Sequence, residues 1–134
     1  MALTVMAIAE SINIMGKRSG TAMKERNPGP VQEMAKEEAA AGSSYLDLNI
    51  GPARKDGTEL MPWIVETVEA VSDLPLVLDT TNVDAMAAGF KVVKNKTDAV
   101  LNSIMARPER MEALVPIAAE AGCSVVALLW GPDG

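Results

Sequence analysis

The stretch YLDLNIGP, residues 45–52, decides the fold. Side chains alternate across a β-strand, so Asp47 and Asn49 share one face while Leu46 and Leu48 share the other. The leucines are expected to face covering helices. The acid and the amide are expected to lie together near the carboxyl end of the strand. The sequence therefore predicts a strand that has an apolar side and a polar, ligand-facing side.

Similar apolar runs recur along the chain, about 25–30 residues apart, which is the length of one strand with its following helix. Most of them stay apolar until their last residues, as is typical of parallel strands that are covered on both faces. The predicted strands are Leu3–Ala9, Tyr45–Ile50, Leu74–Asp79, Ala99–Ser103 and Ser124–Trp130.

Four helices are predicted between these strands from their start and stop signals. Asn27 precedes Pro28 and begins a helix that stops before Gly42. Others begin near Thr58, after Asn82 and at Pro108, the last with Gly122 as its stop. The apolar positions expected to face the core in the last helix are Met111, Leu114, Val115 and Ala118.

Composition excludes several classes of function. The 134 residues are 49% hydrophobic with a net charge of −6, which argues against binding to nucleic acid or to an anionic membrane. A signal peptide and a membrane-spanning run are not recognised, so a cytoplasmic protein is expected. Histidine is absent, which excludes imidazole zinc sites and Ser-His-Asp or Cys-His catalysis. Cys123 is the single cysteine, so no metal site is predicted, and a buried structural thiol is expected there.

Residues 1–134 read as a single α/β domain, and two architectures fit the alternating pattern: an open doubly wound sheet and a (β/α) barrel. In both, the carboxyl ends of parallel strands meet at one rim, where ligands bind. Asn82 is expected to be only a helix cap. The polar residues predicted to gather at the rim are Glu10, Asn13, Asp47, Asn49, Asp79 and Asn102.

Four segments in register carry a family resemblance: ESINIMG at 10–16, LDLNIGP at 46–52, LDTTN at 78–82 and LNSI at 101–104. Together they resemble the strand ends of pterin-binding (β/α) barrels. This family includes methyltetrahydrofolate:corrinoid/iron–sulfur protein methyltransferases, the folate domain of cobalamin-dependent methionine synthase and, more distantly, dihydropteroate synthase. The resemblance implies the N-terminal part of a TIM-type barrel, about five strands and four helices.

The resemblance also implies a function. Asp79 and Asn102 match residues that hydrogen-bond the pterin ring, and Glu10, Asn13, Asp47 and Asn49 match further positions on the rim. The implied reaction moves the methyl group of 5-methyltetrahydrofolate to the Co(I) corrinoid of a partner protein, such as a corrinoid iron–sulfur protein. The chain itself has no histidine that could bind a corrinoid. It also lacks the cysteine clusters that an iron–sulfur centre needs. The resemblance assigns no catalytic residue within this chain.

Five strands alone leave two sheet edges unpaired, so a longer polypeptide, a homo-oligomer or a second chain is expected to complete the barrel. Three alternatives to the methyltransferase stay open. One is a dihydropteroate synthase-like pterin enzyme. Another is a non-catalytic pterin-binding or assembly subunit. The third is an unrelated response-regulator-like or flavodoxin-like domain.

Overall fold

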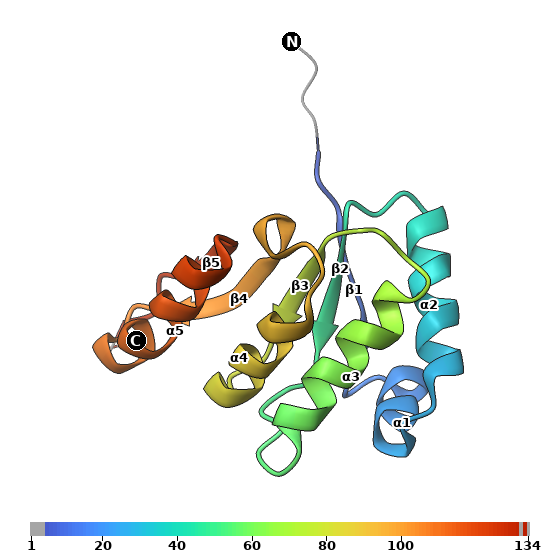
Figure 1. Ribbon diagram of the computed structural model, residues 1–134, viewed down its shortest axis with the longest axis horizontal. Helices are drawn as coiled ribbons and strands as arrows, with labels where there is room; N and C mark the ends of the chain where they lie inside the picture. The colour runs from blue at the N-terminus through green and yellow to red at the C-terminus, as the bar shows by residue number, and fades with distance from the viewer. Residues whose placement is uncertain (1–4, 132, 134) are drawn as a thin grey trace.

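A computed structural model describes residues 5–131 and 133. The chain forms one parallel sheet of five strands in the order β1-β2-β3-β4-β5 (Figure 1). The strands are β1 (Ile8–Asn13), β2 (Tyr45–Asn49), β3 (Leu76–Asp79), β4 (Val100–Met105) and β5 (Ser124–Leu128).

The strand order settles which α/β architecture is present. In a doubly wound sheet the order reverses at a switch point, which places helices on both faces. Here every strand pairs with the next in sequence, and right-handed crossovers then put all the connecting helices on one face. In Figure 1 helices α2 to α5 accordingly lie along one side of the sheet. The chain is therefore part of a TIM-type barrel, and the flavodoxin-like alternative is wrong.

The helices observed are α1 (Lys17–Glu25), α2 (Pro28–Ala40), α3 (Gly57–Glu69), α4 (Val83–Val92) and α5 (Pro108–Ala121), with a short 3-10 helix over Lys96–Asp98. Several predicted signals are confirmed. The Asn27 side chain accepts a hydrogen bond from the backbone N–H of Gly29, with Pro28 at the first helical position. Gly122 ends α5 in the left-handed conformation.

The N-terminal region differs from the expectation in two ways. The strand predicted over Leu3–Ala9 runs instead from Ile8 to Asn13, so Glu10 lies within it rather than at its end; residues 3 and 4 lie outside the described residues. Helix α1 was not predicted, because its sequence is mostly polar and presents only small residues and Met23 to the core.

The hydrophobic core lies between the sheet and its helices. Leu46, Leu48, Leu76, Leu78 and Leu101 are almost completely buried, each at 2% exposure or less. They contact α3 and α4 side chains that include Met61, Ile64 and Met86. This confirms that the leucines of β2 face the helices.

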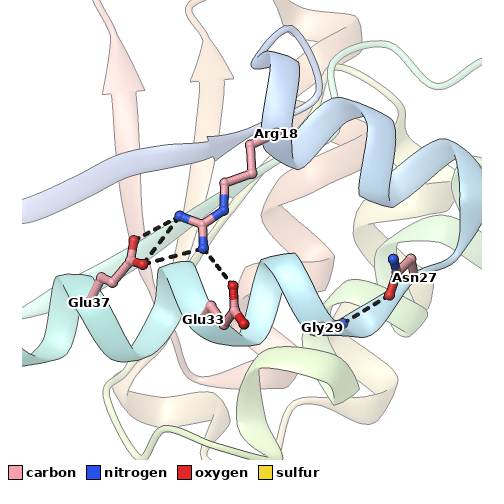
Figure 2. Close-up of polar contacts among 5 residues, drawn as sticks. All are labelled: Arg18, Asn27, Gly29, Glu33 and Glu37. Carbon is pink, nitrogen blue, oxygen red and sulfur yellow. Dashed lines mark hydrogen bonds and ion pairs between the residues drawn. The ribbon is translucent and has the colours of Figure 1, made fainter.

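An ion-pair cluster joins α1 to α2 on the surface. The Arg18 guanidinium contacts the Glu37 carboxylate at 2.9 Å and the Glu33 carboxylate at 2.8 Å (Figure 2). All three side chains are exposed, so water screens the pairs and their contribution to stability is small. Figure 2 also shows the Asn27 cap at the start of α2, which fixes where the second helix begins.

Helix α5 is less buried than predicted. Leu114 and Ala118 face the core, but Met111 and Val115 are each 47% exposed, so the expectation that they face inward is wrong. Cys123 is half-buried against the core rather than enclosed, and burial raises the pKa of its thiol. Within the described residues, no helix has the length and apolarity that crossing a membrane requires.

Candidate functional site

A row of polar residues crosses the sheet near the carboxyl ends of its strands. Asn13 pairs in register with Asn49, Asn49 with Asp79, and Asp79 with Asn102. Residues paired in a parallel sheet project to the same side, and neighbouring strands lie about 4.8 Å apart. The row therefore places four hydrogen-bonding side chains side by side on the face opposite the helices, near the carboxyl ends of the strands. Figure 1 shows the ends of β2 and β3 toward the lower part of the sheet.

Asn49 and Asp79 form the first pair within this row. The Asn49 side-chain amide donates to the Asp79 carboxylate at 2.5 Å. The Asn49 carbonyl in turn accepts from the backbone N–H of Gly51 at 2.9 Å, so both ends of the amide are engaged. Asn49 is thus locked in one orientation, and it holds one oxygen of Asp79.

Asp47 and Asn102 form a second pair, which spans two strands. The Asn102 side-chain amide donates to the Asp47 carboxylate at 3.3 Å, over the intervening strand β3. Asp47 lies one layer below the row, opposite Val77 in the register, and is only 2% exposed. The two pairs together bring Asp47, Asn49, Asp79 and Asn102 into one connected patch.

Burial and like charge set the electrostatics of this patch. Burial raises the pKa of Asp47 to about 7, and the neighbouring carboxylates of Asp79 and Glu10 add to the shift, while the Asn102 hydrogen bond opposes it. Burial likewise raises the pKa of Asp79; its hydrogen bond from Asn49 opposes this and Glu10 adds to it. The patch holds acidic groups under mutual repulsion, a state that donors on a ligand would relieve.

The predicted residues of β1 lie beside this patch. Asn13 is half-buried, and its side-chain oxygen accepts from the backbone N–H of Met15 at 2.9 Å. Buried Ser19 holds the same turn, because its hydroxyl donates to the Asn13 carbonyl at 2.6 Å. Glu10 is exposed but close enough to act on both aspartates. All six predicted residues therefore fall on one side of the sheet.

Sequence reasoning missed Thr80 as an organising residue. Its side chain is 3% exposed, and its hydroxyl donates to the carbonyl of Gly51 at 2.5 Å while accepting from the backbone N–H of Asn82. The Asn82 side chain caps α4 by accepting from Ala85, as predicted, and its amide also donates to the Ala53 carbonyl. Thr80 and Asn82 thus fix the loops after β2 and β3 against each other.

The chemistry of the patch fits a ligand rich in N–H groups. Asp47 and Asp79 each use one carboxylate oxygen in these bonds. Within the described residues, no group donates a hydrogen bond to the other oxygen of either aspartate or to the side-chain oxygen of Asn102. Carboxylate and amide oxygens are acceptors. A flat heterocycle with adjacent ring and exocyclic N–H donors, such as an amino-pyrimidinone, can satisfy several of them at once.

Comparison with known proteins agrees with this chemistry. The model of the pterin binding enzyme family matches residues 10–133. A methylcorrinoid:tetrahydrofolate methyltransferase from Eubacterium limosum is 25% identical over 96 residues, or 72% of this chain and 35% of that protein. Methionine synthases of Mycobacterium leprae and Mycobacterium tuberculosis are 28% and 27% identical over 137 positions, 98% of this chain and 11% of each relative. The chain spans only part of each relative, but the family match covers nearly all of it: the chain belongs to the pterin-binding enzyme family.

Proposed function

We propose that this chain supplies the folate-binding rim of a methyltransferase that moves a methyl group between 5-methyltetrahydrofolate and the Co(I) corrinoid of a partner protein. The observation that carries the proposal is the side-by-side placement of Asp79 and Asn102, each with an oxygen to which no group of the described residues donates. The three relatives described above are named for methyl transfer or methionine synthesis, and one name contains both corrinoid and tetrahydrofolate.

Each residue of the rim has a proposed part in binding. Asp79 accepts from the N–H groups of the amino-pyrimidinone edge of the pterin. Asn102 accepts or donates beside it, since an amide carries both kinds of group. The remaining polar residues of the rim surround the pterin on the same face of the sheet: Glu10, Asn13, Asp47 and Asn49. Held in this way, the reacting nitrogen and its methyl group keep one orientation toward the corrinoid, which lowers the entropic part of the barrier.

The reaction needs one further contribution. A tertiary amine is a poor leaving group, so the ring nitrogen must gain a proton or a strong hydrogen bond as its bond to the methyl carbon breaks. The corrinoid supplies the nucleophilic metal that accepts the methyl group. With no histidine in the chain, we propose that this corrinoid is carried by a partner protein or a separate domain.

We also propose that further polypeptide covers the two edges of this sheet. On the β1 side Val5 and Ile8 are exposed, and beyond β5 Leu129 and Trp130 are exposed. Exposed apolar side chains at unpaired parallel edges are typical of surfaces that other strands cover. Native mass spectrometry distinguishes strands of the same chain from a second copy or a different subunit.

Methyl transfer tests the function directly. The intact protein is mixed with 5-methyltetrahydrofolate and a reduced corrinoid protein, and methylation of the cobalt is followed by its visible absorbance; the reverse direction starts from the methylated corrinoid and tetrahydrofolate. We expect turnover in at least one direction and its loss in Asp79→Ala. Folate binding without turnover in either direction, with a competent corrinoid protein present, would instead favour a non-catalytic pterin-binding subunit.

A further inference from the structure

The two carboxylate–amide pairs of the rim are constrained differently. The Asn49 amide is fixed from both ends, by the Gly51 N–H on its oxygen and by Asp79 on its nitrogen. Among residues 5–131 and 133, the one side-chain partner of the Asn102 amide is Asp47, which binds its nitrogen. Its oxygen has no protein donor within the described residues. The orientation of Asn102 therefore depends on a single contact.

We propose that Asp47 is a positioning residue that sets which atom of the Asn102 amide faces the ligand. An ionised carboxylate only accepts hydrogen bonds, so it forces the NH₂ group of Asn102 inward and the carbonyl outward. A protonated carboxyl can also donate, and then the opposite orientation of the amide becomes allowed. The buried acid thus decides whether the rim presents an acceptor or a donor at Asn102. That the ligand is a folate rests on the function proposed above.

The surroundings of Asp47 support control by protonation. Ionisable groups that act on it, among the described residues, are Glu10 on β1 and Asp79 on β3, and β4 contributes Asn102 itself. Burial and the two like charges hold the pKa of Asp47 at about 7, so both protonation states are populated near neutral pH. The contact distance of 3.3 Å is at the long end for this type of hydrogen bond, so the contact is weak and the loss of the Asp47 charge is enough to change it.

The side-chain amide of Asn102 reports its orientation without any ligand. In ¹⁵N-labelled intact protein, we expect its NH₂ resonances, assigned through Asn102→Ala, to shift with a midpoint near pH 7. Asp47→Asn should abolish that titration. Asp79→Asn is the matched control, because it removes a neighbouring carboxylate that is hydrogen-bonded to Asn49, and it keeps the bond between Asp47 and Asn102. In this control the titration should persist with a lower midpoint, since the Asp79 charge raises the pKa of Asp47.

Ligand affinity provides the second measurement. At pH 8, where Asp47 is ionised in the free protein, we expect Asp47→Asn to bind 5-methyltetrahydrofolate roughly tenfold more weakly, the factor that about 1.4 kcal/mol represents. Asn replaces Asp with little change in volume. A thermal melt of each variant, together with the unchanged resonances of the core methyl groups, shows whether it is folded.

Each outcome decides a separate point. If the Asn102 amide does not titrate, or still titrates in Asp47→Asn, the positioning role is wrong. If the Asn102 resonances titrate in the wild type and not in Asp47→Asn, but this variant binds folate as tightly as the wild type, the orientation of the amide has no effect on the ligand and the proposal fails. If the Asn102 resonances titrate with Asp47 and the wild type binds no folate, the positioning role is supported and the proposed function fails.

Discussion

The two sides of strands β2, β3 and β4 use alternate residues of the same short segments for opposite purposes. Leu46, Leu48 and Leu78 point to the helices and are fully buried in a close-packed core. Asp47 and Asp79 point to the other side, where burial raises the pKa of both; the charges of Asp79 and Glu10 add to the shift of Asp47, and the charge of Glu10 adds to that of Asp79. One side lowers the free energy of the folded state. The other holds two acids, each with one side-chain donor among the described residues.

This difference explains why the site tolerates buried acids. A carboxylate that is removed from water without enough donors costs free energy, and proteins concentrate such groups at functional sites. In this chain the helix-facing side supplies the stability that the polar side lacks. Substitutions on the helix-facing side should therefore act mainly on stability, and substitutions of the rim residues should also act on binding.

The largest effect on stability is expected on the helix-facing side. Leu48→Ala removes a fully buried side chain from the core and should lower the free energy of unfolding by about 2–5 kcal/mol. The control is Lys36→Ala, at an exposed position on helix α2, which should change stability by less than about 0.5 kcal/mol. Urea titration measures both. Equal losses in the two variants would break the distinction between the sides.

The contact between α4 and the sheet should be the next most sensitive. A Cβ added at Gly89 would lie 2.5 Å from Cγ of Met61 and 2.7 Å from Cδ2 of Leu78, so Gly89→Ala overpacks the core. We expect a loss of about 1–3 kcal/mol in thermal or urea unfolding. Gly29→Ala in α2 is the control, since its added Cβ meets nothing closer than 3.5 Å and alanine favours a helix. A neutral Gly89→Ala would show that α4 packs more loosely than the structure indicates.

On the polar side, stability should depend on pH through Asp47. Between about pH 4 and 7 the native carboxyl keeps its proton while the unfolded one, with an ordinary pKa of 3.8, releases it. The native state then binds more protons, so stability falls as pH rises through this window, by up to about 1.4 kcal/mol per pH unit. Asp47→Asn should flatten the slope. An unchanged slope in that variant would assign the effect to other groups.

A smaller effect is expected at the loops that frame the rim. Thr80→Val keeps the shape of the side chain but removes the hydroxyl that bonds the Gly51 carbonyl and the Asn82 N–H. We expect a loss of stability of about 1–2 kcal/mol. Folate binding should weaken too, since Gly51 also holds Asn49. Thr81→Val, at an exposed neighbouring position, is the control and should change neither quantity.

The sequence predicted the parts of the fold that local chemistry encodes. The caps at Asn27 and Asn82 and the stop at Gly122 were found because each is a local signal. Strand β1 was misplaced because Glu10 and Ser11, which lie inside it, interrupt the apolar run by which a strand is recognised. Helix α1 was missed because its buried side is built from Ser19, Gly20 and Ala22, with Met23 as its one large apolar residue.

The candidate site was predictable in its members but not in its connections. Period-2 alternation placed Asp47 and Asn49 on one face, and the strand ends of Asp79 and Asn102 placed them at the rim. Which amide bonds which carboxylate depends on strand register, because Asp47 reaches Asn102 across β3. Register is a property of the assembled sheet, so the pairs and the role of Thr80 appear only in the structure.

The most direct test of the account is calorimetric titration of 5-methyltetrahydrofolate into the intact wild-type protein and its Asp79→Ala variant, with urea unfolding of both. The account predicts that the wild type binds and that Asp79→Ala binds at least about tenfold more weakly, because a ligand N–H group loses its acceptor. It also predicts little loss of stability, since the substitution removes one of the mutually repelling acids. A large loss of stability with unchanged folate affinity would contradict it.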